Sequence, residues 1–185
     1  PETRFNIASV TKPMTVTLAI QLMVERALGY NDTLAKWIPG FPRGKEITIA
    51  QLLRHRAGIP HRVTTTAEEV RPMTAAEVVE AAKRVPLKFQ PGDHESYSSG
   101  GFSVLARVLE LASGKDYATL LQERICGPLR MTHTLHTDSR HLLPGRAASY
   151  EPAPEGLERA PLQDLSFLVG AGSVRADGRD RQILA

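Results

Sequence analysis

The sequence predicts an α+β fold that is mostly helical in residues 1–130 and then continues into short strands. Apolar residues recur at spacings of three and four in several segments before Pro128, which is typical of helices with one buried face. After Pro128 the apolar residues fall instead in short extended pieces between turns. With 185 residues, 42% of them hydrophobic and 23% charged, the chain has the composition of a globular domain.

The first predicted helix covers residues 9–28. Val16 and Met23 belong to its apolar pattern, and Gly29 is a plausible end signal. Pro13 is compatible with a helix only in the first turn, because a proline further along removes a backbone hydrogen bond. The helix is therefore expected to begin at the start of this range.

Three shorter helices are predicted next. Residues 34–38 have the apolar pattern of a short helix that Pro39 ends. Thr48 can cap a helix that carries three apolar residues up to Leu53. The segment 74–77, Thr-Ala-Ala-Glu, is a capping box and predicts a helix to about Arg84.

Two further helices and several short strands complete the prediction. Residues 101–112 return to the helical spacing and stop before Gly114, and residues 117–125 form another helix closed by a Gly-Pro pair. Extended pieces are expected at 134–137, 147–150, 157–160 and 172–176.

We expect one incomplete domain over residues 1–185. It divides into the first helix at 1–28, a helical region at 29–130, and short strands and loops at 131–185. The chain starts at a proline, and residues 179–185 begin an amphipathic pattern that then stops. Both ends therefore predict a fragment of a longer protein.

Composition and charge argue against several function classes. The 23 basic residues alternate with 20 acidic ones and form no block, so a nucleic-acid-binding face is not expected. No apolar run approaches the roughly 20 residues of a membrane span. The single cysteine, Cys126, excludes an internal disulfide and is expected to be a buried apolar filler. The compartment stays open, with a periplasmic or secreted protein and a cytoplasmic one both possible.

The histidines carry no metal-site pattern. His133 and His136 are three apart, but their segment alternates like a strand and has no carboxylate cluster. His55 lies near the end of a predicted helix, where a cation suits the helix dipole, so a structural role is expected. The remaining histidines lie in predicted loops: His61, His94 and His141.

Ser9 and Lys12 are the first pair with a chemical pattern. Residues three apart on a helix share a face, so the two side chains can meet. The positive end of the helix dipole near Ser9 favours a developing alkoxide. A lysine held beside that hydroxyl can accept its proton, which makes a nucleophile without histidine.

Tyr97 and Ser99 form the second element of this pattern, at a loop-to-helix junction. A lysine cation close to a tyrosine favours its phenolate, so Tyr97 can relay a proton. Ser99 can offer a hydroxyl to an ester or amide substrate. Packing of the tyrosine at a helix start would be the alternative explanation of the same residue.

Four blocks in order along the chain resemble the serine β-lactamase superfamily, which includes class C β-lactamases, D-alanyl-D-alanine peptidases and β-lactamase-like esterases. They are FNIASVTKP at 5–13, QLLRHRAGIP at 51–60, PG at 91–92 ahead of YSSGGF at 97–102, and GPLRM at 127–131. Weaker resemblance extends to NDT at 31–33 and GAGS at 170–173. The Ser-x-x-Lys motif is also the signature of penicillin-binding enzymes.

The resemblance implies a helical domain plus part of an antiparallel sheet, and it implies roles for four residues. Ser9 would be the acylated nucleophile and Lys12 its proton partner. Tyr97 would be the general acid or base of the Tyr-x-Asn motif, and Ser99 would contact the substrate. The Ser9 N–H would donate one hydrogen bond to the oxyanion. No cofactor or metal is implied.

Two departures from the family pattern affect the expected chemistry. Ser99 stands where the motif has asparagine, and a hydroxyl is shorter than a carboxamide and lacks its separate donor and acceptor. This departure favours esters slightly over amides. No Lys-x-Gly or His-x-Gly occurs in these residues, so the family's third motif and much of its main sheet are expected to lie outside them.

The sequence thus predicts a serine hydrolase that forms an acyl-enzyme on a small-molecule ester, peptide or β-lactam carbonyl. The alternative is a non-catalytic β-lactamase-like binding module or an inactive fragment, which the missing third motif favours. An incomplete sheet has unpaired edges, so self-association through those edges is also expected.

Overall fold

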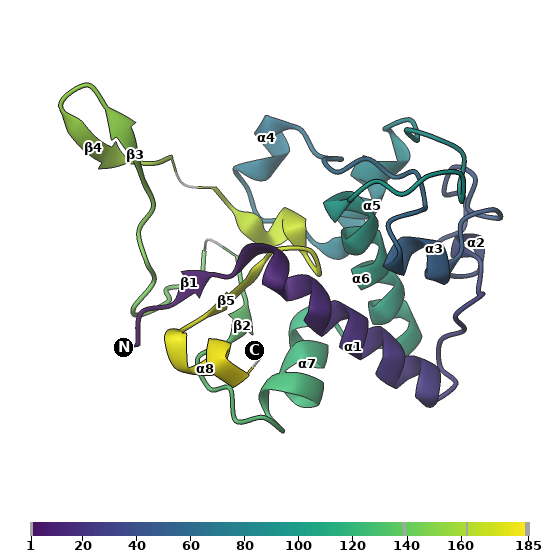
Figure 1. Cartoon of the computed structure of the whole chain (residues 1–185), viewed down its shortest axis with the longest axis horizontal. Coiled ribbons are helices and arrows are strands. Elements are labelled where there is room, and N and C mark those ends of the chain that lie inside the picture. The colour runs from purple at the N-terminus through teal and green to yellow at the C-terminus, as the bar shows by residue number, and fades with distance from the viewer. Residues whose placement is uncertain (1, 139, 162, 184–185) are drawn as a thin grey trace.

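A computed structural model describes residues 2–138, 140–161 and 163–183, and it has the predicted α+β fold. Short helices and turns surround two longer helices, α1 and α6, and small antiparallel sheets lie at one side (Figure 1). The helices are α1 (Thr11–Val24), α2 (Leu34–Trp37), α3 (Ile49–Leu53), α4 (Thr66–Glu69), α5 (Ala75–Lys83), α6 (Ser99–Ser113), α7 (Tyr117–Leu121) and α8 (Gly178–Ile183). The strands are β1 (Phe5–Asn6), β2 (Leu135–His136), β3 (Tyr150–Ala153), β4 (Gly156–Arg159) and β5 (Val174–Ala176).

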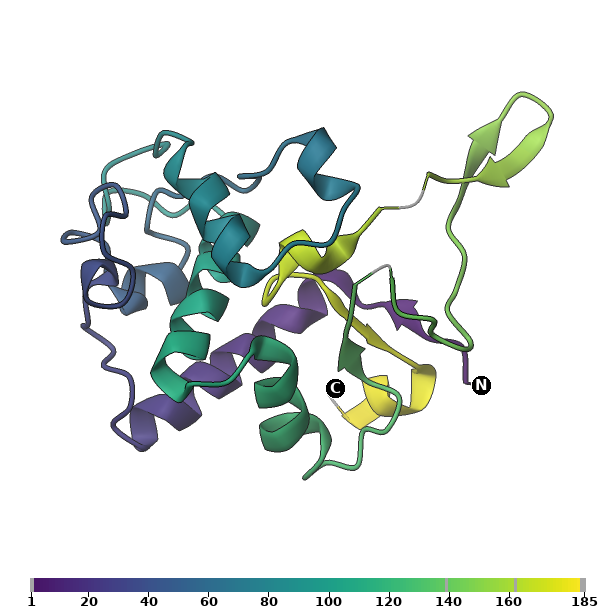
Figure 2. The same cartoon turned by 180° about the vertical axis from the view of Figure 1, so that it is seen from behind.

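The larger sheet joins the two ends of the chain. Its strand order is β1-β5-β2, with both pairs antiparallel, so Phe5 lies opposite Ala176 and Leu135 opposite Arg175. β3 and β4 form a separate hairpin that projects away from the helices in both views (Figures 1 and 2). The sequence did not predict β1, because two residues are too few to show an alternating pattern. Self-association through the outer strands of this sheet stays a prediction.

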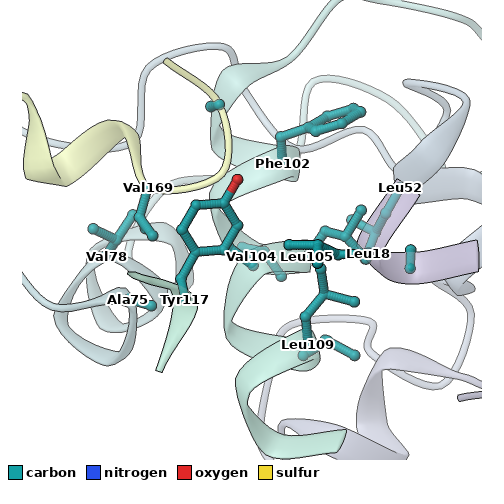
Figure 3. Packing of buried hydrophobic residues seen from close by; sticks show 14 of the residues in the cluster. Leu18, Leu52, Ala75, Val78, Phe102, Val104, Leu105, Leu109, Tyr117 and Val169 are labelled. Atoms are coloured by element: carbon teal, nitrogen blue, oxygen red, sulfur yellow. The ribbon is translucent and has the colours of Figure 1, made fainter. Parts of the chain in front are cut away.

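The core lies between α1, α6 and the helices around them. Phe102, Leu105 and Leu109 form a row on α6 and pack against Leu18 of α1 (Figure 3). Tyr117 enters the same cluster from α7 and is 1% exposed. Side chains at spacings of three and four on α6 thus bury one face of the helix. This packing holds the start of α6 close to the start of α1.

The first helix differs from its prediction at both ends. A short 3₁₀ turn, Ala8–Val10, precedes α1, so Ser9 lies just before the helix. The helix stops at Val24 instead of residue 28, because the chain turns at Arg26, which has a left-handed φ of 60°. Gly29 is not the helix end. Its N–H donates to the Asp32 carboxylate over 2.9 Å in the following turn.

The capping signals were predicted correctly. Thr48 and Thr74 each accept from the residue three positions on, and each capping box is complete. α6 ends at Gly114 as expected, in a left-handed conformation with φ 72°. It begins at Ser99 instead of residue 101, since the Ser98 hydroxyl accepts the Gly101 N–H.

Several other segments differ from the prediction. The extended piece expected at 147–150 is β3, which begins at Tyr150 and continues to Ala153. The predicted helix at 117–125 is α7 followed by a wider π-helical turn, Gln122–Cys126. Neither α4 nor the 3₁₀ turn Leu165–Leu168 was predicted, although Thr65 and Glu68 form a capping box ahead of α4. The pattern at 179–185 corresponds to α8, and residues 184–185 lie outside the described part of the chain.

No helix within the described residues has the length and apolar character that crossing a membrane requires. The division of the chain into residues 1–28, 29–130 and 131–185 stays a prediction.

Candidate active site

Ser9 lies in the sharp turn between β1 and α1, with its side chain at the surface. The preceding Ala8 has φ 45°, a conformation that costs an L-residue energy. Asn6 holds this turn. Its side-chain oxygen accepts the Ala8 N–H over 3.0 Å, and its amide nitrogen donates to the Gly172 carbonyl over 2.8 Å. The turn thus presents the Ser9 hydroxyl at the start of a helix, where the dipole favours negative charge.

Lys12 is one turn further along, and its side chain is 5% exposed. The ammonium donates to the Ser9 hydroxyl over 3.2 Å, to the Ser99 hydroxyl over 3.2 Å and to the Ala171 carbonyl over 2.8 Å. All three acceptors are uncharged. The hydrogen bonds replace water around the buried cation and fix the position of its nitrogen.

The Ala171 carbonyl reaches Lys12 because the chain turns at Gly170, where φ is 69°. A Cβ at this position would lie 2.7 Å from the Ala106 Cβ and 3.1 Å from the Phe102 carbonyl oxygen. Both the φ angle and the close approach to α6 therefore require glycine. This turn explains part of the resemblance of the segment 170–173 to the family.

Tyr97 approaches Ser9 from the loop that precedes α6. Its hydroxyl donates to the Ser9 Oγ over 2.6 Å, and the Lys12 nitrogen lies 4.6 Å from its ring centroid. Burial acts to raise the pKa of Tyr97, but hydrogen bonding to Lys12 and Ser9 and the charge of Lys12 outweigh it. The net effect is a lowered pKa, so the phenolate is more accessible than in free tyrosine.

Ser99 occupies the first turn of α6 and is 5% exposed. Its hydroxyl accepts from Lys12, so it belongs to the same hydrogen-bonded group as Ser9. Gly100 lets this turn pack tightly, because a Cβ there would lie 2.5 Å from the Pro60 carbonyl oxygen. The close contact brings the segment around residue 60 against the site.

The structure brings together all four residues that the sequence singled out. Ser9 and Lys12 come from the start of α1, and Tyr97 and Ser99 come from the start of α6. An ammonium and a phenol that both donate to one hydroxyl can stabilise it as an alkoxide, and the phenolate form of the tyrosine can accept its proton. The arrangement is therefore suited to nucleophilic chemistry.

Two histidines beside Tyr97 were not predicted to belong to this group. The ring centroids of His55 and His61 lie 4.7 Å and 5.5 Å from that of Tyr97. His55 was expected to have a structural role, and its Nδ1 accepts the Ser98 N–H over 3.2 Å. Burial and then the Lys12 charge lower its pKa. His61 lies in a loop with no sequence signal, so only the tertiary contact identifies it.

The other residues that the sequence analysis considered lie elsewhere and have separate partners. His133 Nδ1 contacts Asp177 over 2.7 Å, and His136 Nδ1 contacts the Ser173 hydroxyl over 2.7 Å. Cys126 is buried as expected, and burial raises its pKa to about 11. Among the described residues, no group of three or more histidine, cysteine or acidic side chains is placed to hold a metal ion.

Relatives of this chain are found by sequence, by structure and by a family profile. A Staphylococcus aureus protein named teichoic acid D-alanine hydrolase is 28% identical over 174 residues, which are 94% of this chain and 43% of that protein. The chain thus spans less than half the length of this curated relative.

Solved structures share the fold. A D-stereospecific amidohydrolase from Streptomyces sp. matches with a TM-score of 0.85 and 26% identity, over 98% of this chain and 59% of that one. A penicillin binding protein from Bacillus halodurans matches with a TM-score of 0.83 and 23% identity, over 99% and 59% of the two chains. The family profile described as Beta-lactamase matches residues 1–185 in full. The chain therefore belongs to the Beta-lactamase family.

Proposed function

We propose that this chain carries the acylated serine and its proton-transfer partners in a serine hydrolase. Ser9 is the nucleophile, and Lys12 and Tyr97 move its proton. Ser99 lies where the substrate carbonyl group, or the substrate group next to it, would bind. The observation that supports this most strongly is the pair of contacts on one oxygen, from Tyr97 at 2.6 Å and from Lys12 at 3.2 Å.

The proposed reaction has two steps, and its protons balance. In the reactive state Tyr97 has released its proton to solvent, and the Lys12 charge stabilises the resulting phenolate. The Ser9 oxygen attacks the substrate carbonyl while its proton moves to this phenolate. Tyr97 then returns this proton to the leaving alcohol or amine, and an acyl ester forms on Ser9. Water attacks that ester with the same groups acting in reverse, which releases the acid and frees the serine. The Ser9 N–H is proposed as one oxyanion donor.

Ester substrates are slightly favoured over amides and β-lactams. The Ser99 hydroxyl already accepts from Lys12 over 3.2 Å, so it has less capacity to bind the side-chain amide of a peptide or β-lactam. A relative named teichoic acid D-alanine hydrolase and a structural neighbour named D-stereospecific amidohydrolase support acyl groups of the D-amino acid type.

A cavity of about 300 Å³ beside α6 is the proposed place for part of the substrate. Its lining includes His61 and Gly100, the residue after Ser99 in the chain, together with Phe167 and Leu168 as apolar surface. The remaining lining is mainly polar and includes the Arg62–Glu69 ion pair, so a polar part of the substrate would fit this cavity.

The test uses a fluorophosphonate and a fluorescent penicillin with intact-mass measurement. We expect a covalent adduct on the wild-type protein and none on Ser9→Ala. Ser113→Ala is the matched control, because Ser113 is at the opposite end of α6 and its hydroxyl bonds the Leu109 carbonyl. An adduct that persists in Ser9→Ala would contradict the proposed nucleophile. No adduct on correctly folded wild-type protein would favour the alternative, a non-catalytic binding module.

A further inference from the structure

The proton transfer proposed for Tyr97 requires its side chain to keep one position, although the residue is 47% exposed. A surface tyrosine can leave one rotamer for another at little cost. Yet the hydroxyl must stay within hydrogen-bond distance of Ser9, and a displacement of about 1 Å can lower a rate about 100-fold. The contacts of the Tyr97 ring and of the backbone around it therefore determine whether the hydroxyl stays close to Ser9.

Two imidazoles supply those contacts. The rings of His55 and His61 lie against the Tyr97 ring, with centroid distances of 4.7 Å and 5.5 Å. His55 also packs on Phe102, at 5.0 Å between centroids, so its own position is set by the core. Aromatic rings at these distances attract each other beyond the effect of burial alone.

The same two rings also hold the backbone that follows Tyr97. His55 Nδ1 accepts the Ser98 N–H over 3.2 Å, and His61 Nδ1 accepts the Ser99 N–H over 3.3 Å. The main-chain carbonyls of both histidines accept as well, from the Ser96 N–H at 2.9 Å and from the Gly100 N–H at 3.0 Å. Each histidine thus accepts two backbone N–H hydrogen bonds from the loop-to-helix junction around Tyr97.

This geometry requires both imidazoles to be neutral. A nitrogen that accepts an N–H hydrogen bond cannot carry a proton, so each ring is the Nε2–H tautomer. The charged groups nearby reinforce this state. For both rings, burial and then the Lys12 charge lower the pKa, and Lys88 adds to this for His61. Glu95 opposes it for His55.

We propose that His55 and His61 are positioning residues that act only as neutral imidazoles, holding Tyr97 against Ser9 and releasing it when either ring gains a proton. Protonation removes the acceptor for a backbone N–H and adds a second cation beside Lys12. Both changes loosen the junction that carries Tyr97 and Ser99. The inference rests on the role proposed above for Tyr97.

Asparagine and alanine variants separate positioning from bulk stability. The Oδ1 of asparagine can replace Nδ1 as the acceptor but does not titrate, and asparagine tolerates the left-handed φ of 56° at His55. The probes are p-nitrophenyl acetate turnover and the rate of labelling by a fluorophosphonate, both measured across pH. His141→Asn is the matched control, since His141 lies in a distant exposed loop and bonds Asp138.

We expect His55→Ala and His61→Ala to lower kcat by about tenfold to 100-fold while KM changes less than about twofold. Each asparagine variant recovers most of the rate near neutral pH. The double asparagine variant also loses the part of the acid limb that histidine protonation causes, which a merely structural histidine would not control, whereas the part caused by protonation of the Tyr97 phenolate remains. His141→Asn keeps both the rate and the profile.

The outcomes distinguish this inference from the proposed function. If Tyr97→Phe slows labelling but both alanine variants stay within twofold of wild type, the positioning role is wrong and the function stands. If Tyr97→Phe has no effect, the proposed function itself fails. Should the alanine variants not fold, proton–nitrogen correlation NMR of the wild type still decides. Protonated Nδ1 in either ring near neutral pH would overturn the inference.

Discussion

The Tyr97 hydroxyl lies 2.6 Å from the Ser9 Oγ, although 88 residues separate the two in the chain. The contact exists because α1 and α6 pack side by side through the core and their first turns meet at one point. Lys12 fills the space beside both residues and bonds Ser9 directly. Removing Tyr97 or Lys12 therefore changes the environment of the same Ser9 oxygen.

Replacing Tyr97 with phenylalanine should slow the acylation of Ser9 by about 100-fold to 10,000-fold, the usual contribution of a positioned acid or base. The ring and its contacts with the two histidines remain, so stability should stay within about 0.5 kcal/mol of wild type. Fluorophosphonate labelling rates and thermal melting measure the two effects. A variant that labels as fast as wild type would remove Tyr97 from the mechanism.

Replacing Lys12 should abolish rapid acylation whether or not the new residue is charged. Methionine keeps the buried stem but loses the donor to Ser9 and Ser99. Arginine keeps a charge, but its planar group is larger than an ammonium and donates in a different geometry. Labelling rates of Lys12→Met and Lys12→Arg, with circular dichroism to verify folding, test this. Near-wild-type labelling by either variant would show that the ammonium at this position is dispensable.

Two glycine substitutions separate backbone strain from crowding. Gly170→Ala and Gly114→Ala both place a side chain at positive φ, with angles of 69° and 72°. A Cβ at Gly114 meets nothing within 4 Å, so that variant should lose about 1–2 kcal/mol from strain alone. Gly170→Ala should lose more and should also slow labelling, because the Ala171 carbonyl moves relative to Lys12. Urea unfolding measures the loss of stability in each variant, and fluorophosphonate labelling measures the rate. Equal losses of stability would show that crowding at Gly170 adds nothing to the backbone strain.

Stability should fall as the pH drops from about 6.5 towards 4, and His136 should account for part of the slope. Burial lowers the pKa of His136 to about 4 from its usual 6.5. Within this window the unfolded chain binds a proton that the folded chain does not, so acid favours unfolding. His55 and His61 act in the same direction, since their pKa values are also lowered. The Asp138 carboxyl, with its pKa lowered by Arg140, contributes only at lower pH.

Urea unfolding of the wild type and His136→Asn between these pH values tests this expectation. The variant should show a smaller slope, by up to about 1.4 kcal/mol per pH unit, and His141→Asn should leave the slope unchanged. A slope that His136→Asn does not alter would contradict the assignment.

Local signals in the sequence predicted the elements that local chemistry determines. The threonine caps at 48 and 74 and the glycine end of α6 were found because they depend on neighbours within four residues. The end of α1 was missed, since the left-handed turn at Arg26 has no residue-type signal. β1 was missed because it is a strand only through its pairing with β5.

The candidate site likewise contains residues that the sequence predicted and residues that only the tertiary structure identifies. Spacing predicted that the side chains of Ser9 and Lys12 could meet. A loop-to-helix junction added Tyr97 and Ser99 as candidates, and the family resemblance implied the role of each. His55 and His61 needed the tertiary structure, because their importance comes from rings and backbone groups about 40 residues away in sequence. Before folding, nothing distinguishes His61 from His94 or His141.

Peptide mapping after fluorophosphonate labelling identifies which serine of the chain is acylated. Trypsin does not cut between Lys12 and a following proline, so Ser9 is the single serine in the peptide 5–26, and Ser98 and Ser99 belong to the peptide 89–107. We expect the added mass on the peptide 5–26, at Ser9. Label on the peptide 89–107, or on no peptide of a correctly folded protein, would contradict this expectation.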